Sequence, residues 1–237
     1  MQGTVDKPSY VLRDWRLQIN LDQVLRSMGV SLIAQSHSSA VTKLAERALR
    51  EGLPLVSPLV AYCKHAVVSV GHEQITLRGG GHLTGKLVAK HLAASKKVLL
   101  IVATISAKLE ERISQVLKHD TTYALALDGF GNAAIEALAV AACHHFAEAA
   151  AIHGSHTTMP LSPGMVGWSV EIGQREIFAL LDTKAIGLEL TSSSLMIPRK
   201  SLSMVIGMGT EAMTSVDTCE YCVMRSTCRY REHYQTK

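Results

Sequence analysis

Apolar residues recur every three or four positions in several parts of the chain, which is the spacing of an amphipathic helix. Residues 21–28 follow this spacing, and Gly29 then ends the predicted helix. The other helices that the pattern predicts cover residues 39–52, 83–92, 106–117, 133–151 and 171–181. The helix over 133–151 is alanine-rich, and we expect it to start after a turn at 128–132.

Short runs of β-branched and other apolar residues predict the strands. They cover residues 67–70, 74–77, 98–104, 186–190, 195–197 and 202–206. The run over 98–104 is continuously apolar and rich in valine and isoleucine, which indicates a buried strand. Strands and helices do not alternate as in a doubly wound fold, so we predict an α+β domain with a largely antiparallel sheet.

The predicted elements divide the chain into three parts. An N-terminal arm is expected over residues 1–16, one domain over 17–207, and a cysteine-containing tail over 208–237. Residues 1–16 lack the apolar core of a secretory signal, and no apolar run reaches 18 residues. We therefore expect a cytoplasmic protein that does not span a membrane.

Charge adds little to this picture. The net charge is +4 and the basic residues are scattered, which does not indicate a nucleic-acid partner. Residues 80–86 match the spacing of a phosphate-binding loop, but Leu87 stands where a Ser or Thr would bind magnesium. A glycine turn before a helix is the favoured interpretation, and a nucleotide-hydrolysing enzyme is a weak rival. His144 and His145 are adjacent, so on a helix they point about 100° apart and do not form a ligand pair.

The tail carries the most specific motif. Its three cysteines are spaced C-x2-C-x5-C and are Cys219, Cys222 and Cys228. Thiolates at such spacing suit zinc or an iron–sulfur cluster. The residues that could supply a fourth ligand are His233, Cys63 and Cys143.

Several stretches, in order and at matching spacing, resemble the reactivation domain of cobalamin-dependent methionine synthase. The C-terminal ones are residues 161–164 with Trp168, Gln174 and Arg175, then 186–191, then 194–201. The N-terminal ones are residues 24–29, 98–104, 109–113 and 128–139. The resemblance runs from about residue 17 to the end, and is greater to short free-standing relatives with a cysteine-rich tail.

The resemblance implies a single curved α+β domain that binds S-adenosylmethionine in a shallow groove and caps a cobalamin domain. The implied ligand-binding residues are Glu136, Pro160, Ser162, Pro163, Gly164 and Met165. The implied function is that of an accessory subunit in the reductive reactivation and methylation of a corrinoid protein. The partners would be a corrinoid-binding protein or methyltransferase subunit, which carries the cobalamin, and an electron donor protein. If the chain is itself an enzyme, the reaction is methyl transfer.

The chain departs from the family pattern at the implied ligand loop. The family usually has an arginine four residues before the glycine and a tyrosine just after it, where this chain has Pro160 and Met165. An alternative function therefore stands beside the first. In it the fold serves as a corrinoid-protein binding or electron-transfer module, with a metal or iron–sulfur tail and no S-adenosylmethionine site.

Overall fold

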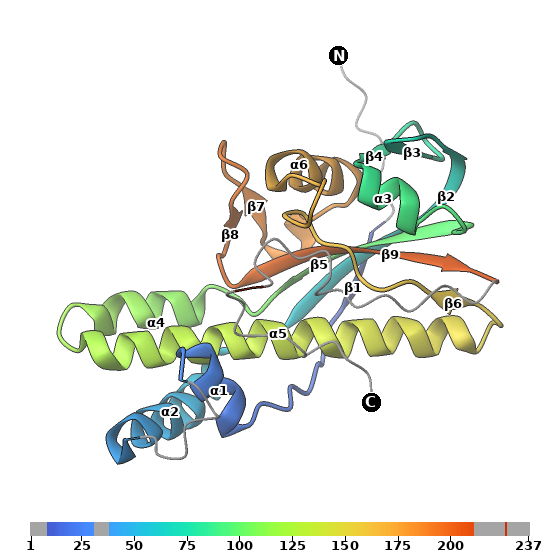
Figure 1. Cartoon of the computed structure of the whole chain (residues 1–237). Coiled ribbons are helices and arrows are strands. Elements are labelled where there is room, and N and C mark those ends of the chain that lie inside the picture. The colour runs from blue at the N-terminus through green and yellow to red at the C-terminus, as the bar shows by residue number, and fades with distance from the viewer. Residues whose placement is uncertain (1–8, 31–37, 211–225, 227–237) are drawn as a thin grey trace.

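The computed structural model describes residues 9–30, 38–210 and 226. A twisted antiparallel sheet runs through its centre (Figure 1). The long central strands are β2 (Leu59–Val70), β5 (Lys97–Thr104) and β9 (Ser201–Gly209). β5 pairs with β2 on one side and with β9 on the other, both antiparallel.

Shorter strands complete the sheet at both edges. They are β1 (Tyr10–Leu12), β3 (Gln74–Leu77), β4 (His82–Thr84) and β6 (His156–Thr157). The order along the sheet is β4-β3-β2-β5-β9-β6, and β1 pairs with β2 beside this path. A separate hairpin joins β7 (Glu189–Leu190) to β8 (Met196–Ile197).

Helices cover both faces of the sheet (Figure 1). One face carries α1 (Leu21–Ser27), α2 (Ser39–Gly52), α4 (Lys108–Leu117) and α5 (Thr121–Ala151). The other face carries α3 (Lys86–His91) and α6 (Val170–Leu180). Two short 3-10 turns are η1 (Leu53–Leu55) and η2 (Lys184–Ile186).

Strand β5 shows why its sequence is continuously apolar. Leu99, Ile101 and Ala103 are fully buried in the core beneath α5. The alternate residues Val98, Leu100 and Val102 are fully buried in the core beneath α3 and α6. Because successive side chains of a strand point to opposite faces, a strand covered on both faces is apolar throughout. The mixed α+β class and the antiparallel sheet are as predicted.

The turn that we expected at residues 128–132 is wrong. α5 runs unbroken from Thr121 to Ala151, and both glycines of the expected turn lie inside it. A Cβ atom at Gly129 would lie 2.6 Å from Met28 Cγ, and one at Gly131 would lie 2.9 Å from Leu109 Cδ2. The glycines therefore allow other helices to approach α5 closely, which their turn propensity did not reveal.

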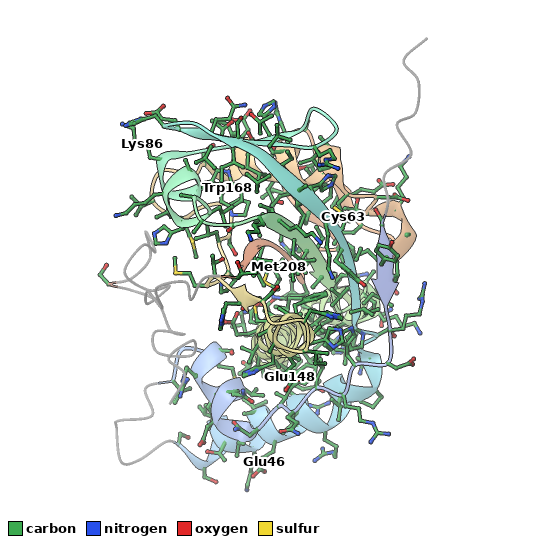
Figure 2. The ribbon with its side chains drawn as sticks, turned by 90° about the vertical axis from the view of Figure 1, so that its right-hand side faces the viewer. Glu46, Cys63, Lys86, Glu148, Trp168 and Met208 are labelled. Atoms are coloured by element: carbon green, nitrogen blue, oxygen red, sulfur yellow. The ribbon has the colours of Figure 1, made fainter. Side chains whose placement is uncertain are left out.

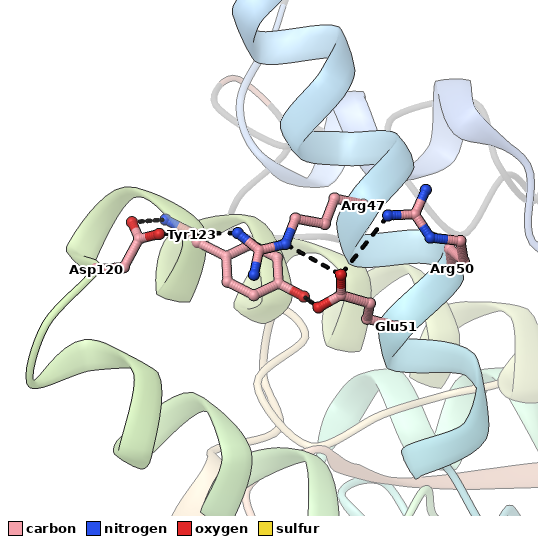
Figure 3. A network of polar contacts seen from close by, with 5 residues as sticks. All are labelled: Arg47, Arg50, Glu51, Asp120 and Tyr123. Carbon is pink, nitrogen blue, oxygen red and sulfur yellow. Dashed lines mark hydrogen bonds and ion pairs between the residues drawn. The ribbon is translucent and has the colours of Figure 1, made fainter.

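A polar network joins α2 to the start of α5 (Figure 3). The Tyr123 hydroxyl donates to Glu51 at 2.5 Å, and the Arg47 guanidinium lies 3.7 Å from the centre of the same ring. Arg47 also donates to Glu51 at 3.1 Å. The Tyr123 hydrogen bond, more than the Arg47 contacts, lowers the pKa of Glu51. Burial, followed by the Glu51 hydrogen bond, raises the pKa of Tyr123 to about 12.

Three other expectations need correction or detail. The predicted helix over 83–92 is wrong at its start, because His82–Thr84 form β4 against β3, and α3 covers only Lys86–His91. Strand β4 also occupies the middle of the motif that resembled a phosphate loop, and Lys86 Nζ pairs with Glu73 at 3.1 Å. The glycine-turn interpretation is therefore the better one.

Within the expected arm, Tyr10–Leu12 form β1 and pair with β2.

Within the part of the chain that the structure describes, one helix is long and apolar enough to cross a membrane by length and composition alone. It is α5, whose most apolar window is 56% buried inside the protein. Figure 2 looks along this helix and shows it between the sheet and the α1 and α2 layer. A buried core helix meets the same length and hydropathy criteria.

Candidate functional site

The loop at residues 160–168 leaves the edge of the sheet beside β9. Leu161 exchanges two backbone hydrogen bonds with Val205 of β9, at 2.8 and 2.9 Å, and its side chain is fully buried. After this anchor the chain turns, with Gly164 at φ +102°. This backbone conformation strongly favours glycine. The residues implied as ligand-binding here, Pro160, Ser162, Pro163, Gly164 and Met165, are all partly exposed.

Trp168 holds the far end of this loop. Its carbonyl accepts from the Gly164 amide at 2.8 Å, and its amide donates to Met165 O at 3.0 Å. The buried indole donates from Nε1 to Glu176 of α6 at 3.4 Å. Glu176 also accepts from the Thr84 amide at 3.0 Å. The Glu176 carboxylate therefore connects the loop and β4 to α6. Figure 2 shows Trp168 on the side of the sheet opposite α5.

Glu136 lies on α5, on the opposite side of β9 from the core that holds Leu161. Two turns later on the same face of α5, Cys143 Sγ contacts Met204 Sδ of β9 at 3.6 Å. The next residue, Val205, is the partner of Leu161. Burial, with the Glu136 carboxylate as the second cause, raises the pKa of Cys143 to about 12. Glu136 therefore belongs to the helix that packs on this part of β9, and the loop belongs to the segment that pairs with the edge of the same part of β9.

Lys200 joins two of the stretches that carried the family resemblance. Its buried Nζ lies 2.7 Å from Asp128 Oδ1 and donates to Asn132 Oδ1 at 2.6 Å. Its backbone amide donates to Glu110 Oε1 at 2.7 Å. The residues that we expected to form a turn are therefore helical partners of a lysine about 70 positions away.

Other residues of the resemblance also connect elements of the scaffold. Gln174 accepts a hydrogen bond from Ser203 of β9 at 3.0 Å, inside the core. Arg175 donates to Ser194 Oγ and to Ser192 O, each at 3.3 Å, and so ties α6 to the β7–β8 hairpin. Much of the resemblance therefore lies in residues that hold the fold together.

A cavity of about 500 Å³ lies between the N-terminal segment, α1 and α5. Its lining residues are Arg16, Gln18, Gln23, Ala137, Val140 and Ala141. A second cavity, of about 410 Å³, lies between the end of α6 and the β7–β8 hairpin. The first cavity lies next to Glu136 along α5, and its lining combines polar side chains with apolar residues of the helix. None of the sequence motifs indicated this cavity.

The described residues include no group of three or more His, Cys, Asp or Glu side chains placed to hold a metal ion. Two of the thiols considered as a fourth tail ligand are in poor positions for that role. Cys63 is fully buried and donates to Leu180 O at 3.6 Å. Cys143 is partly buried on α5, where its Sγ contacts Met204 Sδ of β9 at 3.6 Å. The tail cysteines Cys219, Cys222 and Cys228, with His233, lie outside the described residues.

Comparison with known proteins gives one clear finding. No protein-family model matches the sequence, and no curated protein matches it. Among solved structures, the chain is similar to the crystal structure of the MetH reactivation domain bound to AdoHcy, with a TM-score of 0.63. The likeness covers 88% of this chain and 81% of that one. This chain has the fold of the MetH reactivation domain.

The reactivation-domain fold confirms the single curved α+β domain that the sequence resemblance implied. Identity to the MetH domain is 11%, so the comparison shows the fold alone. Sequence reasoning missed Glu176, which closes the loop through Trp168, and Arg16, which lines the larger cavity. Neither residue stands in a spaced motif, so only the folded chain reveals its place.

Proposed function

We propose that this protein is a cytoplasmic accessory subunit that binds S-adenosylmethionine and docks on a corrinoid protein to support its reductive reactivation. One observation carries the proposal, namely the fold shared with the MetH reactivation domain, which was solved with AdoHcy bound. The ordered family-like stretches add support, because the loop at 160–168 and Glu136 flank the same part of β9.

The loop offers polar groups that suit a nucleoside. The Pro160 and Gly164 carbonyls accept no hydrogen bond from the described residues, and the Ser162 hydroxyl also makes none with them. Backbone and hydroxyl groups of this kind fix the orientation of a small ligand in a mostly apolar site. The residues present therefore fit a ligand with a polar heterocycle and a ribose.

Each residue then has a defined task. Leu161 and Trp168 fix the two ends of the loop, so Ser162 and the loop carbonyls are presented at constant geometry. Glu136 supplies a carboxylate that accepts hydrogen bonds from an ammonium group. When bound, S-adenosylmethionine supplies a methyl group, and the corrinoid of the partner supplies the cobalt that receives it. The protein contributes binding and orientation, as proteins do for most cofactor chemistry.

Calorimetry with AdoHcy and S-adenosylmethionine tests the proposal. Wild-type protein should release or absorb heat on binding, and Gly164→Val should abolish it. A Cβ at Gly164 would lie 3.1 Å from Val170 Cγ2, in a conformation at φ +102° that a branched residue rarely adopts. Gly154→Val is the matched control, because Gly154 also has positive φ, at +64°, but has nothing within 4 Å of its Cβ position. Absence of heat with the wild-type protein would contradict ligand binding.

The alternative module without an S-adenosylmethionine site is favoured by one observation. Met165 turns inward, where it packs against the core beneath α6 and its Sδ accepts from the Ser162 amide at 3.5 Å. It offers no hydroxyl at the position of the usual tyrosine, and Pro160 offers no guanidinium. Under this alternative, the protein binds an isolated corrinoid protein in gel filtration while giving no heat with AdoHcy.

We further propose that Cys219, Cys222 and Cys228 bind a metal, with an iron–sulfur cluster favoured over zinc. Three soft donors within ten residues support this, and reduction of a corrinoid needs a low-potential electron. His233 becomes the favoured fourth ligand within the chain, since Cys63 is fully buried and Cys143 Sγ contacts Met204 Sδ of β9.

Metal analysis of anaerobically purified protein tests the tail. Iron and sulfide with a brown colour that dithionite bleaches would support a cluster, whereas zinc in colourless protein would support a structural knuckle. Cys222→Ser should lower the metal content, and Cys63→Ala serves as the control cysteine. Metal content that does not depend on Cys222 would contradict both the iron–sulfur cluster and the structural zinc site in the tail.

A further inference from the structure

We propose that Arg16 binds the carboxylate at the amino-acid end of the ligand, within the cavity between the N-terminal segment and α5. This inference rests on the proposed function, which requires a ligand with a nucleoside at one end and an amino acid at the other. It assigns the cation of the site to a part of the chain outside the loop at residues 160–168, where Pro160 stands in place of the usual arginine.

The cavity has the composition that such an end requires. Its floor is formed by Ala137 and Ala141 of α5, and its polar wall by Arg16, Gln18 and Gln23. Among the described residues, no ion pair or hydrogen bond occupies the Arg16 guanidinium. A guanidinium with available N–H groups matches the geometry of a carboxylate and can bind it through two hydrogen bonds.

The neighbouring carboxamide adds a donor. Gln23 Oε1 accepts from the Asn20 amide at 2.8 Å, as part of the cap of α1. With its carbonyl engaged, the Gln23 side chain offers its N–H groups to the cavity that it lines. Among the described residues that line the cavity, Arg16 carries the charge, so the cavity favours an anionic group over a cationic one.

Arg16 is held in place by its neighbours along the chain. Trp15 packs edge-on against His145 of α5, with ring centres 5.7 Å apart, and donates from Nε1 to Leu12 O at 3.4 Å. Leu17 and Ile19 pack against the core beneath α5. The backbone on both sides of Arg16 is thus attached to the core, and this reduces the entropy lost when the side chain binds a ligand.

The cavity continues the surface that bears Glu136. Ala137 follows Glu136 directly, and Val140 lies one helical turn beyond it. At a rise of about 1.5 Å per residue, the span from Glu136 to Ala141 is roughly 7.5 Å. The carboxylate of the amino-acid end is therefore assigned to Arg16, beside the part of α5 that follows Glu136.

Calorimetry with two ligands tests Arg16 separately from the site as a whole. The ligands are AdoHcy and 5′-deoxy-5′-methylthioadenosine, which keeps the nucleoside but lacks the carboxylate. Arg16→Gln should weaken AdoHcy binding by about tenfold to hundredfold, the effect of losing hydrogen bonds to a charged group. It should leave binding of the methylthio nucleoside unchanged, and Arg16→Lys should recover part of the loss.

Arg13→Gln is the matched control, because Arg13 is also exposed on the N-terminal segment but does not line the cavity. Circular dichroism should show that all three variants are folded. Equal AdoHcy affinity for the wild type and Arg16→Gln would overturn the Arg16 assignment while leaving the proposed function intact. An equal loss for both ligands would also overturn it, since the effect would not depend on the carboxylate. A wild-type protein that binds neither ligand would overturn the proposed function and the Arg16 assignment together.

Discussion

Replacing Lys200 by methionine should destabilise the fold strongly. Methionine keeps an unbranched apolar side chain but removes the charge that lies 2.7 Å from Asp128 Oδ1. It also removes the donor to Asn132 Oδ1 at 2.6 Å. The two acceptors then stay on α5 without their cation, while the site remains mostly enclosed, because the Lys200 side chain is only 10% exposed.

The size of the stability loss depends on how much water reaches the Asp128 carboxylate once Lys200 is replaced. Removing one member of a buried ion pair costs about 3–5 kcal/mol. The Asp128 side chain is 36% exposed, so water partly replaces the lost cation. We therefore expect a loss of about 2–3 kcal/mol in the free energy of unfolding. For a protein of this size, that corresponds to a decrease of about 5–10 °C in Tm.

Urea unfolding followed by circular dichroism measures this change. The double variant Lys200→Met/Asp128→Asn should lose less than the sum of the two single variants, by about 1 kcal/mol or more, because the residues interact directly. Arg199→Met is the control at the exposed neighbouring position, and should change stability by less than about 0.5 kcal/mol. Strictly additive losses, or a Lys200→Met variant as stable as the wild type, would refute the reasoning.

Three further predictions concern other parts of the fold. Tyr123→Phe should destabilise the protein by about 1–2 kcal/mol at pH 7, because it removes the hydrogen bond to the charged Glu51. The folded-state pKa of Tyr123 is raised from 10 to about 12, so its contribution is full below pH 10 and is lost as pH rises to 12. Urea titrations should therefore show the two proteins converging over that range, and a constant difference would contradict the linkage. In a variant with serine at position 143 and at all three tail cysteines, Cys63 should react with a thiol reagent only after unfolding, because it is fully buried; rapid labelling of that variant while folded would contradict this burial. Gly173→Ala should lower Tm and weaken AdoHcy binding, because its Cβ would lie 2.7 Å from Trp168 Cε2. An unchanged Tm would contradict this, since it would mean that Trp168 moves aside without loss of stability.

Local patterns alone predicted several elements of this protein. The helix over Ser39–Gly52 and the buried strand near residues 98–104 formed as expected. In both cases the information is local. Helical spacing of apolar residues indicates a helix, and a short run rich in valine and isoleucine favours a buried strand through its length and its β-branched residues. The family-like stretches also indicated the overall fold, which the likeness to the MetH reactivation domain confirms.

Other features depend on contacts between distant parts of the chain. Gly129 and Gly131 lie in a helix because Met28, Leu109 and Lys200 pack closely against them, and this packing outweighs their turn propensity. His82–Thr84 form a strand only because β3 is present to pair with them. No local pattern contains these partners, so sequence reasoning assigned the wrong structure at both places.

The candidate site shows the same division. The sequence by itself predicted the loop with Gly164 as part of a ligand site, because its spacing resembled a family pattern, and it contains the cysteine motif of the tail. Tertiary structure decided that Leu161 pairs with β9, that Glu136 flanks the same strand, and that Arg16 lines a cavity over α5. The physical reason is that a binding site depends on the positions of side chains from separate elements, and those positions are set by packing of the whole core.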